Sequence, residues 1–473
     1  MSYNKINFRV SKQEENNLEA SLDHSNNRVN NNDIKENPSH FIIDILLDKM
    51  SYLKYGPSNI IFSFGDNKLN QTSHDGYDML TLPRLVYKIC DLKVKKIFSG
   101  YNYNFIIDYD NNVYSWGDNS SGQCGLGDKI IIKSPNKLFF PELQENDFIE
   151  NIICGNNTTY FISNKEKLFL CGFNYILKKF FYFPTLLEIN FDSKVVQIKS
   201  GEDFSLFLTD KGDVYSIGFG SEGQLGIKNI LYEYEQKKYC PKPTKIINSI
   251  KYISCGNKHC FAISNKGDIF CWGKNDKGQL GLNFCEHMKE RKDSFCILSP
   301  LKLQDYLGDI EIKDIICGSN FTFFQTKNDD LLACGNNDKE QLGIQENKTF
   351  QKSLNKICND YITPTEIEQF FKLKAVKIAC GEEHCLAIIK DTISNLENIW
   401  CWGANQFGQI GLGSYVKKSK PKPNHFLLEF INHKILDISA GKNHSMILLQ
   451  RKDYNELNND ETLTNLIFKY SLI

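Results

Sequence analysis

The strongest constraint on the fold is a short stretch that recurs along the chain. Residues Cys271–Leu282 read CWGKNDKGQLGL, and segments of the same pattern return at intervals through most of the 473 residues. A fixed period of this kind is the signature of a repeat architecture, in which one unit is too small to bury its apolar residues alone. The copies begin at Phe62, Ser115, Leu170, Ser216, Cys271, Ala333 and Cys401, and those from Phe62 and Leu170 lack the GQLG segment.

A second element follows each copy of the first. One example is CGNKHCFAI from Cys255, and the glycines of successive copies lie 46 to 63 residues apart. A proline also stands between the two elements in every unit. The glycines are Gly100, Gly155, Gly201, Gly256, Gly318, Gly381 and Gly441, and the prolines are Pro83, Pro135, Pro184, Pro241, Pro300, Pro364 and Pro421.

Each unit contains short β-prone runs separated by turn signals. In the region around Gly256, the runs 253–255, 260–263 and 268–272 are separated by GNKH and NKG. Four short strands per unit cannot bury both faces of their sheet, whereas sheets arranged radially bury each other. The sequence therefore predicts an all-β fold, a seven-bladed β-propeller of four-stranded blades. The expected units are 60–107, 113–163, 168–209, 214–264, 269–326, 331–389 and 399–449.

The two ends of the chain differ from the repeats. Residues 1–40 are rich in asparagine and charge and poor in aromatics, which predicts a disordered tail. Residues 41–58 are expected to form a short helical or irregular lead-in, and 59–473 the propeller, with 450–473 as a possible closing strand. Either Asn59–Phe64 or Leu466–Ile473 could complete the closing blade, which would remove the exposed edges of the ring.

The two elements together, [S/C]WG-x-N-x-x-GQLG and CG-x-x-H-x-[LF]-A-[IL], resemble the regulator of chromosome condensation repeat family. The resemblance covers Ile60–Leu449, and both motifs recur in a fixed order. It implies a seven-bladed propeller, which agrees with the number of units. The founding activity of the family is guanine-nucleotide exchange on the nuclear GTPase Ran.

The glycine-rich segments also resemble nucleotide-binding loops. Gln279 and Leu280 stand where a phosphate loop needs lysine and a hydroxyl, and Gly218, Gly220 and Gly223 spell G-x-G-x-x-G without a Rossmann context. We interpret these segments as propeller turns and expect no cofactor. Glycines permit positive φ in such turns, and Gln279 is expected to satisfy backbone groups. The turn glycines of this set are Gly117, Gly273, Gly278 and Gly403.

The cysteine and histidine clusters could pass for half of a zinc site. Equivalent positions in separate blades do not converge to zinc bond lengths, however, so we expect packing roles, with each histidine bonding a neighbouring backbone. Replacing Gly256 or Gly381 with valine is expected to cost about 1 to 3 kcal/mol if these turns need positive φ. The expected structural residues of the second element are Gly256, His259, Gly381, His384, Gly441 and His444.

Composition narrows the function classes. The net charge of -1 does not favour nucleic acid or an anionic membrane, and the sixteen cysteines include no C-x-x-C pair. Reduced thiols in the cytosol or nucleus are therefore expected. Neither G-x-S-x-G nor H-E-x-x-H occurs, so no catalytic site is expected. The chain is expected to be a monomeric propeller that binds one or more proteins and neither nucleic acid nor membrane.

Long loops are the candidate partner-binding segments. Insertions after Leu282 and Ile344 exceed the matching loops of other units, and loops free of scaffold constraints often carry binding residues. The alternative is that these are lysine-rich surface loops without a role. KKSKPK at 417–422 is a candidate nuclear localisation signal, although it lies in the loop of its own repeat before the proline. The candidate contact residues are Lys289, Arg291, Lys292, Lys348 and Lys352, with Asp118 and Asn119 as further surface positions.

Two functional hypotheses remain open at this point. One is a non-catalytic scaffold or regulatory module that binds proteins. The other is nucleotide exchange on a Ran-like small GTPase, which stabilises the nucleotide-free GTPase by differential binding. The chain departs from the Ran exchange factor in three respects: its tail is nearly neutral, its early units are compact where that protein inserts a wedge, and two early copies lack GQLG.

Overall fold

The computed structural model describes residues 59–450, apart from residues 190, 231, 235, 283–294, 304–306, 309, 345–355, 358–359, 371–372 and 429–432. These residues belong to a single compact unit, Gly56–Arg451. The tail 1–40, the lead-in 41–58 and the segment 451–473 lie outside the described residues, as do the candidate contact residues Lys289, Arg291, Lys292, Lys348 and Lys352.

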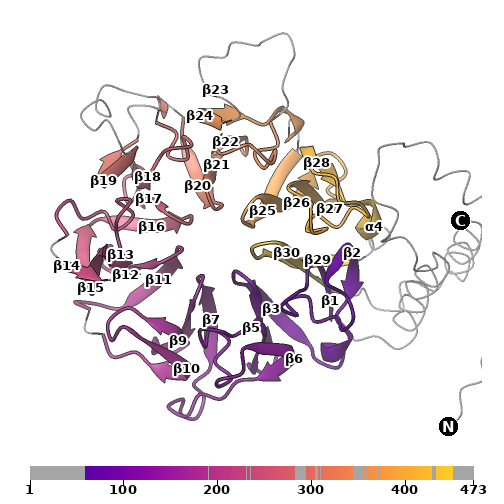
Figure 1. The fold of residues 1–473 in the computed structure, drawn as a ribbon. Helices are drawn as coiled ribbons and strands as arrows, with labels where there is room; N and C mark the ends of the chain where they lie inside the picture. Colours follow the sequence, from indigo (N-terminus) through magenta and orange to yellow (C-terminus); the bar gives the residue numbers. More distant parts are fainter. Residues whose placement is uncertain are drawn as a thin grey trace, which may run out of the picture. The chain divides into compact units, whose positions relative to one another are not determined.

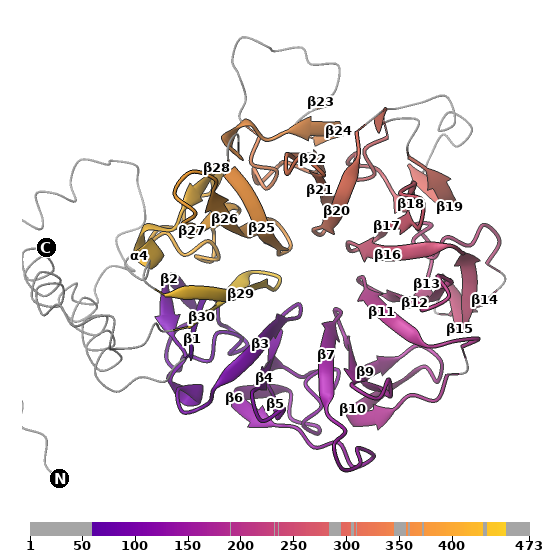
Figure 2. The same cartoon turned by 180° about the vertical axis from the view of Figure 1, so that it is seen from behind.

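Seven antiparallel sheets are arranged radially around a central axis, and the two opposite views show the same ring (Figures 1 and 2). Each sheet is one blade, which confirms the predicted all-β, seven-bladed propeller. Five blades have four strands and two carry a fifth short strand at the edge. No helix within the described ranges is long and apolar enough to span a membrane.

The first strand of each blade lies nearest the axis, and the second strand packs behind it (Figure 1). Second strands are buried along almost their whole length, since the faces of each blade pack on the adjacent blades. The first strands are β3 (Val94–Ser99), β7 (Ile149–Cys154), β11 (Val195–Ser200), β16 (Ile250–Cys255), β20 (Ile312–Cys317), β25 (Leu373–Cys380) and β29 (Lys434–Ala440). The second strands are β4 (Tyr103–Asp108), β8 (Thr158–Ser163), β12 (Phe204–Thr209), β17 (His259–Ser264), β21 (Phe321–Thr326), β26 (His384–Asp391) and β30 (His444–Gln450).

The third strands carry the WG-type element, and the fourth strands carry the unit's proline. In one blade, Ser115 pairs with Asn136 and Gly117 with Ile132, so Pro135 falls in a bulge, where its missing N–H costs no ladder bond. The third strands are β5 (Val113–Asp118), β9 (Leu168–Asn174), β13 (Val214–Phe219), β18 (Ile269–Lys274), β22 (Leu331–Gly335), β27 (Glu397–Gly403) and β1 (Asn59–Asp66). The fourth strands are β6 (Ile131–Lys137), β10 (Lys179–Leu186), β15 (Lys237–Ile247), β19 (Cys296–Lys302), β24 (Asp360–Glu366), β28 (Lys418–Pro423) and β2 (Met79–Leu85).

A few short elements are added to this scheme. Two edge strands, β14 (Tyr232–Tyr234) and β23 (Lys356–Ile357), pair with the fourth strands of their blades. Short helical turns occur at η1 (Tyr87–Ile89), η3 (Glu368–Phe370) and α4 (His425–Leu428). The candidate signal KKSKPK coincides almost entirely with strand β28.

Both ends of the described chain form the closing blade. β1 pairs with β30 from Asn59 opposite Gln450 to Gly65 opposite His444, in a sheet of order β2-β1-β30-β29. Of the two candidates for the closing strand, Asn59–Phe64 therefore occupies it, while Leu466–Ile473 lies outside the described residues. The sequence units are also offset from the blades, because each unit begins with a third strand and ends with the second strand of the following blade.

Adjacent blades are joined through the carbonyl of the glutamine in the first element. The carbonyl of Gln341 accepts a hydrogen bond from the Trp402 indole N–H of the next blade at 2.8 Å. Gln224 and Trp272 form the same pair at 3.0 Å. The WG and GQLG segments are thus two halves of one contact between blades, which explains why both recur.

Candidate functional site

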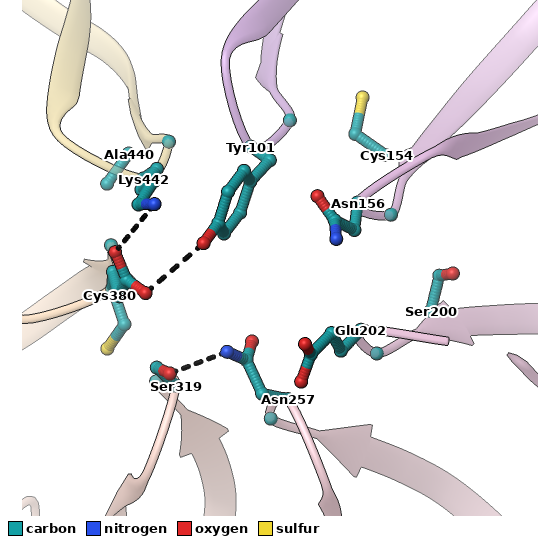
Figure 3. Close-up of a pocket in the computed structure, with 18 of the residues that line it drawn as sticks. Tyr101, Cys154, Asn156, Ser200, Glu202, Asn257, Ser319, Cys380, Ala440 and Lys442 are labelled. Carbon is teal, nitrogen blue, oxygen red and sulfur yellow. Dashed lines mark hydrogen bonds and ion pairs between the residues drawn. The ribbon is translucent and has the colours of Figure 1, made fainter. Parts of the chain in front are cut away.

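A cavity of about 180 Å³ lies on the axis of the ring and is lined by three consecutive residues from every blade (Figure 3). These residues form the turn between the first and second strands, called here the inner turn. The first is serine, cysteine or alanine, the second is glycine, and the third varies from blade to blade. The variable residues are Tyr101, Asn156, Glu202, Asn257, Ser319, Glu382 and Lys442.

The inner turns lie beside the ends of the third strands. The Lys274 N–H donates to the Lys258 carbonyl at 2.8 Å, and the Ala404 N–H donates to the Glu383 carbonyl at 2.8 Å. In an antiparallel sheet, the turn after the first strand and the turn after the third strand lie at the same end. The inner turns and the long outer turns therefore share one side of the ring, which we call the pocket face. The outer turns that follow β18 and β22 begin on this side, and the insertions 283–294 and 345–355 lie outside the described residues.

One side of the pocket is lined by a charged cluster of Tyr101, Glu382 and Lys442. The Tyr101 hydroxyl donates to Glu382 Oε1 at 3.3 Å, and Lys442 Nζ lies 3.7 Å from Glu382 Oε2. The same ammonium lies 4.4 Å from the centre of the Tyr101 ring. Burial raises the pKa of Tyr101. Burial alone would lower the pKa of Lys442, but its contacts with Tyr101 and Glu382 raise it, so this cluster keeps a neutral phenol and a charged ammonium.

The opposite side of the pocket carries mainly amides and carboxylates. Asn257 Nδ2 donates to Ser319 Oγ at 2.7 Å, and Lys258 Nζ lies 3.5 Å from Glu202 Oε2. Burial raises the pKa of Asp203 and of Glu383, which follow the pocket residues in their turns. The pocket face therefore presents carboxylates close to the axis that are partly withdrawn from water.

Each histidine of the second element bonds a side chain of the next blade. The Thr322 hydroxyl donates to the Gln279 carbonyl at 2.8 Å, so the His259 Nε2–H donates to Thr322 Oγ1 at 2.9 Å. A backbone contact of the expected kind is present between His259 and Phe321 of the next blade, and the side-chain partner is an addition that was not expected. His384 with Ser445 and His444 with Asn104 repeat the arrangement. Burial lowers the pKa of all three histidines to about 3.

The inner-turn glycines are required for a different reason from the one expected. Gly256, Gly381 and Gly441 are not among the glycines with positive φ, so that premise is wrong. A Cβ at Gly256 would instead meet the His259 ring and the Gly318 carbonyl of the next blade. The first-element glycines behave as predicted and adopt positive φ, with values of 108° at Gly117, 96° at Gly273, 78° at Gly278 and 94° at Gly403.

The stretch CWGKNDKGQLGL forms an outer turn held by two amide side chains. The Leu280 N–H donates to Asn275 Oδ1, and the Lys277 N–H donates to Gln279 Oε1, both at 2.8 Å. Leu280 and Gln279 are buried, so neither is presented to a ligand. The turn therefore organises its own backbone and the contact with the next blade.

The two shortened copies differ from each other. The copy from Phe62 keeps the turn, because the Thr72 N–H donates to Asn67 Oδ1 and the Leu69 N–H donates to Gln71 Oε1. Asn70, with φ of 58°, replaces the usual glycine. The view that this copy had lost its glutamine segment is therefore wrong. The copy from Leu170 has lost the segment, and its chain turns directly from β9 into β10.

Two predicted surface residues have mainly local contacts. Asn119 is 1% exposed, and its amide nitrogen donates to the carbonyls of Gly127 and Lys129. Its assignment as an exposed contact residue is wrong, because it has the same turn-organising position as Asn275. Asp118 is partly buried and accepts a hydrogen bond from the Ser120 N–H at 3.0 Å.

Four cysteines of the inner turns line the pocket, and three of them are poor ligands and nucleophiles. Burial raises the pKa of Cys255 to about 12 and also raises that of Cys154 and Cys317, so these thiols stay protonated. Within the described ranges, His, Cys, Asp and Glu side chains do not gather in groups of three or more suited to a metal ion.

One feature of the pocket face was missed from sequence. The outer turn after β13 is extended into a hairpin of β14 and β15, in which Glu233 pairs with Lys238. Its tyrosines and lysines stand beside the turn that joins β9 to β10, as contacts of Lys178 with Tyr234 and Tyr239 show. The run YEYEQKKY contains no glycine or proline that would have marked a turn.

The repeated turns and the seven blades agree with comparison to known families. A family model described as RCC1-like domain matches residues 178–447, which is more than half of the chain. Models of the regulator of chromosome condensation (RCC1) repeat match residues 94–123 and 110–162. The chain belongs to the RCC1 repeat family. The resemblance inferred from the two sequence elements is thereby confirmed.

Similar proteins come from yeasts. Protein pim1 of Schizosaccharomyces pombe is 26% identical over 384 residues, covering 75% of this chain and 67% of that protein. Guanine nucleotide exchange factor SRM1 of Saccharomyces cerevisiae is 25% identical over 377 residues, covering 71% of this chain and 73% of that protein. The crystal structure of Prp20p from Saccharomyces cerevisiae matches with a TM-score of 0.73 and 22% identity, over 88% of this chain and 98% of that one, and supports the fold.

Proposed function

We propose that this RCC1-type propeller is a regulatory protein-binding module whose pocket face holds a partner protein. The observation that carries this proposal is the position of the variable side chains. Residues that differ between blades, such as Tyr101, Glu202 and Lys442, line the pocket. The repeated residues instead form contacts within and between blades. A rigid ring that presents variable groups on one side is suited to recognition.

A Ran-like small GTPase is the second, more specific candidate, with nucleotide exchange as the activity. Its support is similarity to SRM1, which is named as a guanine nucleotide exchange factor, and to Prp20p, which is described with binding properties to Gsp1p and histones. A further support is the hairpin of β14 and β15, which extends an outer turn in the unit 214–264, where compact early units were expected. If a Ran-like GTPase is the partner, we expect this protein to be located in the nucleus and not in the cytoplasm.

Exchange would require no bond chemistry in the propeller. A partner that binds the nucleotide-free GTPase more tightly than the loaded form shifts the population toward nucleotide release. The partly buried carboxylates of Glu202 and Glu382 are the residues of the pocket face that we expect to contribute to such differential binding.

Release of a fluorescent guanine nucleotide from a Ran-like GTPase tests the exchange candidate. We expect substoichiometric protein to accelerate release, and the charge-reversed variant Glu202→Lys/Glu382→Lys to lose most of this acceleration. Asp110→Lys is the matched control, because Asp110 is exposed in the turn between second and third strands, on the opposite side of the ring.

The same samples separate the two candidates. Complex formation with the GTPase in size-exclusion chromatography, without faster release, would support the binding module and contradict exchange. Absence of both across several small GTPases would contradict the GTPase as partner. Equal effects of the pocket-face and control variants would contradict the assignment of the pocket face.

A further inference from the structure

An aromatic surface crosses from one blade to the next on the pocket face. Phe180 of β10 lies 5.2 Å, centre to centre, from Phe173 of β9, and the rings continue through Tyr175 to Phe219 of the next blade. Phe219 in turn lies 6.1 Å from Tyr234 of the hairpin. We call Phe173, Lys178, Phe180, Phe219, Tyr234 and Lys237 the aromatic–lysine band.

Part of this surface is open to solvent. Phe180 is 44% exposed, Leu177 in the turn before it is 55% exposed, and Tyr232 of the hairpin is 61% exposed. The blade that contributes Phe180 has lost the outer turn that packs against the next blade elsewhere in the ring. Aromatic side chains exposed together at adjoining elements are characteristic of an interaction surface.

The lysines of the band stand over the rings. Lys178 Nζ lies 4.8 Å from the centre of Tyr234 and 4.9 Å from that of Tyr239, and Lys237 Nζ lies 5.6 Å from that of Phe219. Among the described residues, neither lysine forms an ion pair with a carboxylate, whereas many other lysines of this protein do. Two cations are thus held at the surface by aromatic rings, without a carboxylate within ion-pair distance among the described residues.

The two surrounding segments together carry a net positive charge, which comes from the stretch 174–183. The stretches 174–183 and 232–239 contain Lys178, Lys179, Lys237 and Lys238 but only Glu233 and Glu235, a local charge of +2 on a chain whose net charge is -1. Asp203 is partly buried and interacts electrostatically with Lys237, whereas the excess positive charge comes from Lys178 and Lys179. The excess positive charge is therefore a local property of this surface.

Two strand edges border the band. β10 is the outermost strand of its sheet, and β14 is the outermost strand of the next. The Tyr182 carbonyl of β10 accepts from the Gly127 N–H, so the end of β10 near Pro184 is covered by the preceding blade. The end of β10 next to the band, at Lys179 and Phe180, is where an extended chain could lie along the sheet.

We propose that the aromatic–lysine band binds an extended acidic peptide segment of a partner protein, with an aromatic or aliphatic residue among its carboxylates. Carboxylates pair with Lys178 and Lys237, and the apolar side chain packs on Phe180 and Phe219. Complementarity of charge, together with rings that run between two strand edges, favours this occupant. The inference requires neither a GTPase partner nor exchange activity.

Fluorescence anisotropy with a short labelled peptide tests this proposal. The probe contains Asp and Glu around one Phe, and matched peptides carry Gln or Lys in place of the acids. We expect the full chain to bind the acidic peptide, to bind it more weakly as salt increases, and to bind the Lys peptide least. The variant Lys178→Glu/Lys237→Glu should weaken acidic-peptide binding by roughly tenfold or more.

Three controls keep the test decisive. Lys251→Glu/Lys434→Glu reverses two exposed lysines of inner strands β16 and β29 and should bind as wild type does. Phe180→Ser probes the ring surface without changing charge, and thermal unfolding checks that each variant is folded. Equal binding of the acidic and Gln peptides, or equal loss in the control variant, would overturn the proposal. Tighter binding to vesicles of anionic lipid than to the acidic peptide would instead identify a membrane surface and also overturn it.

Discussion

At the scale of single residues, the inner-turn glycines make room for the next blade. Gly256 faces the His259 ring and the Gly318 carbonyl, so a methyl group there must displace a neighbouring backbone. Gly267 has φ of 91°, but a Cβ there would meet no atom within 4 Å. Crowding and backbone strain can therefore be separated in one protein.

We predict that Gly256→Ala costs about 2 to 3 kcal/mol of unfolding free energy through crowding at a packed contact. Gly267→Ala should cost about 1 to 2 kcal/mol through the left-handed backbone alone. Urea unfolding of both variants measures the difference. A smaller loss for Gly256→Ala than for Gly267→Ala would contradict the account of the inner turn.

The buried histidines make stability depend on pH. His259, His384 and His444 have a pKa of about 3 in the folded protein, against 6.5 as their ordinary value, because burial disfavours the charged ring. The unfolded chain binds these protons first as the pH falls. The stability that the neutral rings provide is therefore complete above pH 6.5 and is lost progressively as the pH decreases toward 3.

Between pH 6.5 and pH 5, each such histidine should reduce the free energy of unfolding by about 2 kcal/mol. The variant His384→Gln removes one of these groups and should lose about 2 kcal/mol less than the wild type over this range. Urea unfolding of the wild type and of the variant, each at pH 7 and at pH 5, provides the four free energies of unfolding. The same pH dependence in both proteins would show that His384 is not buried in its neutral form.

Sequence patterns could identify repeated residues but not their partners. The role of Gln279 in its turn followed from the recurrence of GQLG, whereas the hydroxyl partner of His259 comes from another blade, 63 residues away. Gln71 was missed because Asn70 adopts positive φ where other copies have glycine, which conceals the motif. Asn119 looked exposed because turn asparagines usually are, but here it binds its own turn.

At the scale of elements, closure of the ring depends on β1. Phe64 of β1 is fully buried, stands opposite Ser445 of β30 and faces the outer turn at Gly411. Removing this ring leaves a cavity where the two ends of the propeller meet.

We predict that Phe64→Ala destabilises the protein by about 3 to 5 kcal/mol, as expected for a buried phenylalanine. Phe139, at 78% exposure, provides the matched control, and Phe139→Ala should change stability by about 0.5 kcal/mol or less. Thermal unfolding of both variants checks this. Equal melting temperatures would contradict closure through β1.

The number and type of blades could be predicted because each unit repeats the same strand and turn signals. The closing strand could not be predicted, because Asn59–Phe64 and Leu466–Ile473 are both short apolar runs. Only the pairing of β1 with β30 in the structure identifies Asn59–Phe64 as the closing strand. The hairpin of β14 and β15 was also missed, since its turn lacks glycine and proline. The aromatic–lysine band could not be foreseen, because it forms only when two blades are packed side by side.

At the scale of the whole molecule, the ring separates structural from variable residues. The glutamines, tryptophans and histidines of the two elements join blades, whereas the pocket residues differ from blade to blade. The pocket face also carries the outer turns and the hairpin of β14 and β15. Partner recognition and any effect on a bound GTPase are therefore both expected on this side.

Hydrogen–deuterium exchange of the complex with a nucleotide-free Ran-like GTPase tests this central claim most directly. We predict protection of the inner turns at 100–102, 201–203 and 381–383 and of the hairpin 232–239, with turns 109–112 and 265–268 on the opposite side unchanged. Protection confined to those opposite turns would contradict the claim that the pocket face is the binding side.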